Sequence, residues 1–200
     1  MTVKLFKDSD TFNSYAAANG VGGAAAYFSP MQNELCGYKT TSQGKQLSIH
    51  IMYHEAMHQY LHALFGEEVR IPIWLNEGMA EYFFGGEFND SMGRFVIGPN
   101  KERIDTIRQA CRSESFVPLK KLFKYSQAQY YSNAQLCYAQ GWSIAYFLWT
   151  TKDPKYVGVI ENFMKLLRQT KDSEKAFDET FGKLDIDQLE KDWKEGVIKF

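Results

Sequence analysis

Cysteine and proline are both scarce in this chain of 200 residues, which contains three cysteines and five prolines. Three scattered cysteines are too few for a disulfide framework or for a metal site built from cysteines. One disulfide with one remaining thiol is an alternative, but three free and largely buried thiols are favoured. These cysteines are Cys36, Cys111 and Cys137.

A charge imbalance and a long apolar run are also missing. The 23 basic and 24 acidic side chains give a net charge of -1, so the chain has no broad positive field to attract nucleic acid or an anionic membrane. No apolar stretch approaches the roughly 18 residues of a membrane span. The first residues lack the apolar segment of a signal peptide. We therefore expect no nucleic-acid partner, no membrane span and no signal peptide.

The remaining composition is that of a globular protein, with 44% hydrophobic and 24% charged residues. The length fits one domain over residues 1–200. Residues 1–45 are β-rich and residues 46–200 have helical patterns, so the predicted fold class is α+β.

The predicted elements follow from local patterns and turn signals. A strand over 3–6 precedes a helix that Asp8-Ser9-Asp10 can cap and that runs through about Ala18. Strands over 24–28 and 34–39 flank a turn-rich connection that indicates a hairpin. Asp153-Pro154 and Asp172-Ser173 are good helix starts, and Gly66 and Gly182 are good stops. The predicted helices are 46–65, 73–84, 100–111, 133–151, 154–169, 173–180 and 185–198.

An H-E-x-x-H pattern formed by His54, Glu55 and His58 lies in the first long predicted helix. Residues four apart are separated by about 40° around a helix axis, so both imidazoles can face one metal ion. Glu55 lies beside them and could hold a water at that ion as a general base. An ordinary solvated helix face with two histidines is the alternative.

A third ligand is expected from the next predicted helix, which carries Glu77 and Glu81. Zinc binds imidazole nitrogen and carboxylate oxygen, and catalytic sites keep a fourth position open. Gly66 and Pro72 bracket the connection after His58, which allows an antiparallel return. Glu81, one turn further, could accept a hydrogen bond from the outer nitrogen of a ligand histidine. An exposed carboxylate pair is the alternative, although the apolar neighbours make unpaired charge costly there.

These patterns resemble those of the gluzincin metallopeptidases, which include thermolysin-like and aminopeptidase N-like enzymes. The shared features are H-E-x-x-H, an 18-residue gap and an Asn-Glu-Gly string. The resemblance implies a zincin-like fold and one zinc ion per chain, held by His54, His58 and Glu77. It implies that Glu55 is the catalytic base. In the thermolysin-like pattern, Glu81 replaces the aspartate that supports a ligand histidine.

A further match begins at Tyr138. Its spacing to Gly141 resembles the Tyr-x-x-Gly string that carries the transition-state tyrosine of aminopeptidase N-like enzymes. A phenol there would donate a hydrogen bond to the developing oxyanion. With 12 tyrosines in the chain, a packing role is the alternative, and Tyr130, Tyr131 and His62 are then substitute donors.

Over nearly its whole length the chain resembles compact bacterial peptidase-like domains of unknown function, which usually occur in exported proteins. The shared features are an opening strand and helix, a hairpin before the metal helix, the string from Pro72 to Phe83, the Tyr138 string, and a closing Phe-Gly followed by a helix. This resemblance implies a periplasmic or extracellular location.

Two further observations bear on the substrate and on the histidines. The Gly-x-Met-Glu-Asn string that captures a free amine in aminopeptidase N-like enzymes is missing, and Glu34 is the one acid between Asp10 and Glu55. A strand near 35–38, if it lies at the sheet edge, could align an extended peptide. His50 and His62 extend the spacing of four, but a rotation of about 120° between them prevents all four histidines from sharing one ion.

The predicted function is that of a zinc metallopeptidase, more an endopeptidase than an aminopeptidase, acting on a peptide or protein substrate. Glu55 would accept a proton from the attacking water and return it to the leaving amine. A non-catalytic zinc-containing binding or structural domain is one alternative, although it would need no base. Hydrolysis of a non-peptide amide by the same groups is another.

Overall fold

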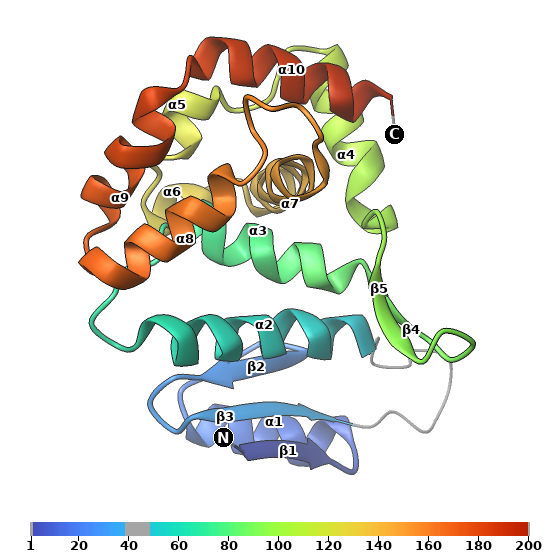
Figure 1. Cartoon of the computed structure of the whole chain (residues 1–200). Coiled ribbons are helices and arrows are strands. Elements are labelled where there is room, and N and C mark those ends of the chain that lie inside the picture. Colours follow the sequence, from blue (N-terminus) through green and yellow to red (C-terminus); the bar gives the residue numbers. More distant parts are fainter. Residues whose placement is uncertain (1, 39–48, 200) are drawn as a thin grey trace.

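The computed structural model describes residues 2–38 and 49–199 of the chain. It confirms the predicted α+β class, with a small N-terminal mixed sheet followed by a mostly helical body (Figure 1). The predicted end of a strand at Lys39 and the predicted helix start at Gln46 lie outside the described residues. No helix within the described ranges is long and apolar enough to cross a membrane.

The N-terminal sheet contains β1 (Thr2–Phe6), β2 (Ala26–Ser29) and β3 (Glu34–Tyr38) in the order β1-β3-β2. β3 runs parallel to β1 and antiparallel to β2, which confirms the predicted hairpin. β3 is the central strand, so the condition for residues 35–38 to align a peptide, a position at the sheet edge, is not met. β2 is the outer strand on the side of the helical body (Figure 1).

Helix α1 (Ser9–Ala18) covers this sheet and forms a small core with it. The Asp8 side chain caps the helix by accepting a hydrogen bond from the backbone N–H of Thr11 at 2.8 Å, as the sequence predicted. Phe12 is fully buried against Tyr27.

The helices α2 (Ile49–Phe65) and α3 (Ile73–Phe84) run antiparallel, one above the other, between the sheet and the helical body (Figure 1). Gly66, at φ +79°, adopts the left-handed conformation that ends α2, and Pro72 precedes α3. α3 is apolar around most of its circumference and is accordingly buried, packing on α2 and on α7 (Ala134–Thr150).

The helical predictions for α3, α4, α7, α9 and α10 agree with the structure within one residue. The hairpin of β4 and β5 and the short helices α5 and α6 were not predicted. The remaining bounds are β4 (Gly86–Asn89), β5 (Arg94–Ile97), α4 (Lys101–Arg112), α5 (Leu119–Leu122), α6 (Gln127–Ser132), α8 (Val159–Thr170), α9 (Ser173–Thr180), a 3-10 turn (Phe181–Lys183) and α10 (Ile186–Ile198).

The predicted start of a helix at residue 154 is wrong, since α8 begins at Val159. The Asp153 side chain accepts a hydrogen bond from the backbone N–H of Lys155 and closes a turn. Gly158 then takes φ +78°, a left-handed conformation that separates this turn from the helix.

The main core lies inside the helical body and contains the fully buried Trp74, Trp142 and Trp193. A core of this size needs no covalent crosslinks. All three cysteines are free and buried, which confirms the favoured reading of the cysteine count.

Candidate metal centre

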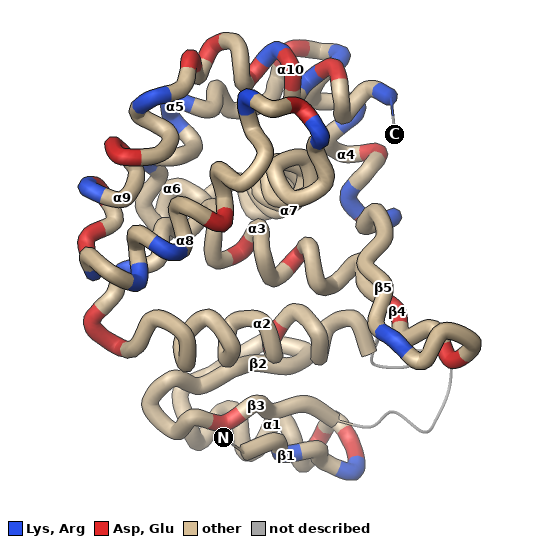
Figure 2. Tube along the Cα trace, viewed as in Figure 1, with Lys and Arg blue, Asp and Glu red and all other residues tan. Residues whose placement is uncertain are grey.

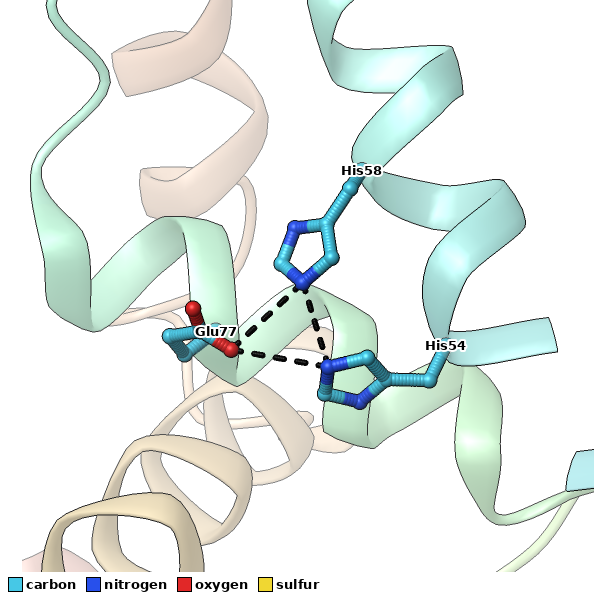
Figure 3. A group of neighbouring side chains, drawn as sticks. All are labelled: His54, His58 and Glu77. Carbon is cyan, nitrogen blue, oxygen red and sulfur yellow. Dashed lines mark hydrogen bonds and ion pairs between the residues drawn. The ribbon is translucent and has the colours of Figure 1, made fainter. Parts of the chain in front are cut away.

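The structure brings the three predicted ligands together (Figure 3). His54 and His58 lie one turn apart on α2, with their Nε2 atoms 3.1 Å apart. Oε2 of Glu77 on α3 lies 3.5 Å from each of these nitrogens. Ligand atoms about 2.0–2.1 Å from a tetrahedral ion are separated by roughly 3.3 Å. The three atoms therefore have the spacing that one such ion requires.

The buried Oε2 of Glu77 gives a second test of fit. Glu77 is 4% exposed, and Oε2 receives no hydrogen bond from the described part of the chain. A buried carboxylate oxygen without a donor is unfavourable. A cation between it and the two imidazoles would satisfy it, so the His54/His58/Glu77 group could hold a metal ion.

A close crossing of α3 and α7 fixes the position of Glu77. A Cβ atom on Gly78, the residue after Glu77, would lie 2.6 Å from the carbonyl oxygen of Gly141 on α7. A Cβ atom on Gly141 would lie 2.4 Å from the hydroxyl of Tyr130. Gly78 of the Asn-Glu-Gly string and Gly141 of the Tyr-x-x-Gly string therefore have the same role. Because neither has a side chain, the helix with Glu77 and the helix with Tyr138 can touch.

Each imidazole is anchored through its outer nitrogen by a residue of α3. Oδ1 of Asn76 lies 3.1 Å from Nδ1 of His58, and Oε1 of Glu81 lies 3.4 Å from Nδ1 of His54. An acceptor at Nδ1 favours the tautomer with its proton there and leaves the Nε2 lone pair toward the metal position. The predicted placement of Glu81 behind His54 agrees with this geometry.

Glu81 is itself held from α4. The guanidinium of Arg103 donates two hydrogen bonds to its carboxylate, from Nε at 2.8 Å and from Nη2 at 2.9 Å. Nδ2 of Asn100 donates a third at 2.8 Å. These donors satisfy a carboxylate that is 2% exposed, and the paired charge of Arg103 offsets the desolvation of Glu81.

The electrostatics of the centre are set by burial and by the proximity of opposite charges. Burial by itself raises the pKa of Glu77, but the two imidazoles outweigh it and hold this pKa well below its usual range. Burial lowers the pKa of His54, whereas Glu77 and Glu81 raise it, with a net value of about 10. Protons on the imidazoles therefore compete with a metal ion for the nitrogen lone pairs.

Glu55 lies beside the ligands and contacts the sheet. Its Oε2 accepts a hydrogen bond from the backbone N–H of Phe28 in β2 at 2.9 Å. Burial raises the pKa of Glu55, and the neighbouring histidines and this N–H oppose the rise. Glu55 and the ligand triad line a cleft of about 760 Å³ between β2, α2 and the loop after α2.

Comparison with known proteins gives a family for this chain. A family model described as "Protein of unknown function (DUF1570)" matches residues 48–173, well over half of the chain. The chain belongs to the DUF1570 family. No curated protein and no solved structure matches it.

In this DUF1570 chain, Tyr138 lines the cleft on its α7 side. Its ring centre is 6.2 Å from that of His54, and the guanidinium of Arg103 lies over the ring at 5.3 Å. Burial raises the pKa of Tyr138, as do the charges of Glu77 and Glu81. Tyr138 is thus a neutral hydrogen-bond donor beside the centre.

The other two candidate tyrosines differ in orientation. The hydroxyl of Tyr130 is fully buried and donates to the backbone carbonyl of Cys137 at 2.6 Å, so it is part of the helical core. The hydroxyl of Tyr131, in α6, donates to Oε1 of Glu77 at 2.6 Å.

The outer two histidines of the DUF1570 chain lie apart from the ligand triad. His62 lines the same cleft and packs against Phe28, with 5.5 Å between ring centres. His50 packs against Phe84 at 5.5 Å. Among the described residues, the group that could hold a metal ion consists of His54, His58 and Glu77.

Sequence reasoning found the ligands and Glu81 but gave no role to four groups around them. These are Asn76, Asn100, Arg103 and the backbone N–H of Phe28. Asn76 could have been found, because it precedes Glu77 in the Asn-Glu-Gly string and lies on the same helix. The others come from distant segments and carry no local signal.

Proposed function

We propose that this protein is a zinc-dependent metallopeptidase. The observation that carries the proposal is the triangle of His54, His58 and Glu77 atoms, 3.1–3.5 Å apart, in a cleft that also holds Glu55. Two imidazoles and one carboxylate are a ligand set of catalytic zinc sites, whereas structural sites are usually closed by four protein ligands. When bound, zinc would supply Lewis acidity to the substrate carbonyl and lower the pKa of a coordinated water.

Glu55 is proposed as the general base. One carboxylate oxygen is oriented by the N–H of Phe28, which leaves the other for a water molecule in the cleft. Glu55 would accept the proton of that water as it attacks and then donate the proton to the leaving amine. A purely structural zinc site would need no general base.

Tyr138 is proposed as the donor to the oxyanion that develops on the substrate carbonyl. It lines the cleft next to His54 and is held by the ring contact with Arg103. A neutral phenol can donate a hydrogen bond to that oxygen without becoming a metal ligand. Tyr138→Phe should keep the zinc content and lower turnover by roughly 100–1,000-fold.

The features around the cleft support an internal peptide bond as the target. Glu34, the one acid close in sequence to β2, is bound by Lys4 and by the hydroxyl of Tyr15 on the opposite side of the sheet, so it cannot capture a substrate amine. The outer strand β2 contacts α2 at the cleft and could pair with an extended peptide. We expect an N-acetylated peptide and its free-amine counterpart to be cleaved equally well.

The centre also supports a single zincin-like domain over residues 1–200. Its ligands lie on the first helices of the helical body, while Glu55 is hydrogen-bonded to β2 of the N-terminal sheet. A site shared between both parts would require them to fold as one unit.

Metal analysis combined with peptide cleavage tests the function. The native protein and Glu55→Gln should each bind one zinc per chain, and cleavage of a peptide library should fall by roughly 10²–10⁴ in the variant. Equal turnover in the two proteins would exclude Glu55 as the base. Zinc binding without cleavage of any peptide would favour a binding domain or a non-peptide amide substrate.

A further inference from the structure

Tyr131 contacts the metal centre in a way that the proposed reaction does not use. Its hydroxyl donates to Oε1 of Glu77 at 2.6 Å, while Oε2 of the same carboxylate faces the two imidazoles. Tyr131 lies on α6, 54 positions after Glu77. Its side chain is 40% exposed at the wall of the cleft.

The Tyr131 contact completes a set of anchors. His58 is anchored at Nδ1 by Asn76 and His54 at Nδ1 by Glu81. The outer atom of each ligand thus has a protein partner, and each inner atom remains toward the metal position. Such partners set the orientation of metal ligands and commonly change metal affinity 10–100-fold when removed.

A carboxylate differs from an imidazole because both of its oxygens can bind the same metal ion. A hydrogen bond to Oε1 uses one lone pair of that oxygen and fixes the orientation of the carboxylate, whereas Oε2 receives no hydrogen bond within the described ranges. We propose that Tyr131 is a positioning residue that restricts Glu77 to coordination through Oε2, so that a fourth position stays open for water or substrate. This inference rests on the proposed metal site of the preceding section.

The surroundings of Tyr131 suit this role. α6 begins with a capping box in which the side chains of Ser126 and Gln129 bond each other's backbone, and it packs against both α3 and α7. The short helix α6 is therefore fixed by its capping box and by its contacts with α3, which carries Glu77, and with α7, which carries Tyr138.

Tyr138 provides a matched control. The rings of Tyr131 and Tyr138 lie on the same wall, 6.3 Å apart, but the bond to a ligand atom comes from Tyr131. A tyrosine-to-phenylalanine substitution at either position keeps the ring and removes one hydroxyl. The two variants therefore separate the bond to Glu77 from packing of the wall.

The experiment measures metal binding in the full chain by competition with a chromophoric chelator, for Zn²⁺ and for Co²⁺. Tyr131→Phe should bind both ions roughly 10–100-fold more weakly. Its Co²⁺ complex should absorb less strongly in the visible range, because coordination through both oxygens of Glu77 raises the coordination number. Tyr138→Phe, which loses a hydroxyl that contacts Tyr131, should change both measurements much less than Tyr131→Phe, and circular dichroism checks that each variant folds.

Unchanged affinity and an unchanged Co²⁺ spectrum in Tyr131→Phe would overturn the inference. Equal changes in Tyr131→Phe and Tyr138→Phe would overturn it as well, since the effect would then come from the wall. A native protein that binds metal but cleaves no peptide would refute the peptidase proposal and leave the role of Tyr131 intact. A native protein that binds neither ion would remove both.

Discussion

Charge is distributed differently in the α2–α3 pair and in the C-terminal helices α8, α9 and α10 (Figure 2). α2 and α3 carry three carboxylates and no lysine or arginine, and all three carboxylates lie at the metal centre. The three C-terminal helices each carry both signs of charge on faces turned to solvent. Solvated charge needs no special explanation, whereas buried carboxylates are costly unless they are paired.

The comparison fits the proposal that α2 and α3 keep their buried carboxylates to hold a metal ion. Glu77 and Glu81 are 4% and 2% exposed, and a fold that needed only stability would be served as well by apolar side chains there. The C-terminal helices follow the ordinary amphipathic pattern instead. Substitutions in the two regions should therefore differ in which property they change.

The largest effect is expected from removing a ligand of the α2–α3 pair. His58→Ala deletes one of three protein ligands, so the variant should lose most of its zinc. The native protein should lose thermal stability when a chelator removes its metal, and the variant should show no such shift. Elemental analysis measures the zinc bound per chain. Melting temperatures with and without the chelator measure the change in stability.

His50→Ala is the control, because His50 lies two turns before His58 on the same helix and packs against Phe84 outside the triad. It should keep the zinc. Full zinc retention by His58→Ala would refute the assignment of the centre.

The next effect compares one substitution in both regions. In Gly78→Ala the new Cβ would meet the carbonyl oxygen of Gly141 at 2.6 Å. α3 and α7 must then separate, which should lower the free energy of unfolding by about 1–3 kcal/mol and displace Glu77. In Gly196→Ala on α10 the Cβ would meet a ring carbon of Phe147 at 3.4 Å. That variant should be neutral or more stable by up to about 1 kcal/mol, because alanine favours a helix.

Urea unfolding of the metal-free variants measures this difference. Equal stability of Gly78→Ala and the native protein would mean that the crossing of α3 and α7 is looser than the structure indicates. A strongly destabilised Gly196→Ala would remove the contrast between the two regions.

A smaller effect is expected at the support of His54. Glu81→Gln keeps the size of the side chain but removes the charge that pairs with Arg103 and faces Nδ1 of His54. Zinc affinity should fall roughly 10–100-fold, while the ligand set itself stays intact. Competition with a chelator measures the affinity, and an unchanged value would show that Asn76 and Tyr131 suffice to orient the ligands.

The ligand residues could be predicted because they lie on two helices whose positions follow from local periodicity. Spacing along α2 places His54 and His58 on one face, and the turn between Gly66 and Pro72 returns α3 to them. Tyr131 was named only as a substitute oxyanion donor, and its bond to Glu77 was not predicted, nor was any role for Arg103. These residues lie 54 and 22 positions from the carboxylates they contact. Such contacts depend on how α4 and α6 pack, which a single sequence does not encode locally.

The fold shows the same limit. The helices α3 and α9 were predicted with their observed bounds: Pro72 precedes α3, and the Asp172 side chain caps α9. The strands β4 and β5 have four residues each and the helix α6 has six, so their sequences give only a weak period. α8 begins later than predicted because Gly158 takes a left-handed conformation. The Asp153-Pro154 pair had indicated an earlier helix start.

The smallest effect is expected at a solvated carboxylate of the C-terminal helices. Asp192 on α10 accepts hydrogen bonds from the ammonium of Lys155 at 2.8 Å and the hydroxyl of Tyr156 at 2.6 Å. These donors lower its pKa to about 2, so its contribution to stability is present above the ordinary aspartate pKa and lost as the pH falls through about 2. Asp192→Asn should cost about 1 kcal/mol or less at pH 7, with no change in zinc affinity. Urea unfolding at pH 7 and at several values between 4 and 2 should show the two proteins converging as the pH falls. A stability difference between the two proteins that persists to pH 2 would contradict the proposed role of the Asp192 charge. A loss of zinc in this variant would contradict the contrast between the α2–α3 pair and the C-terminal helices.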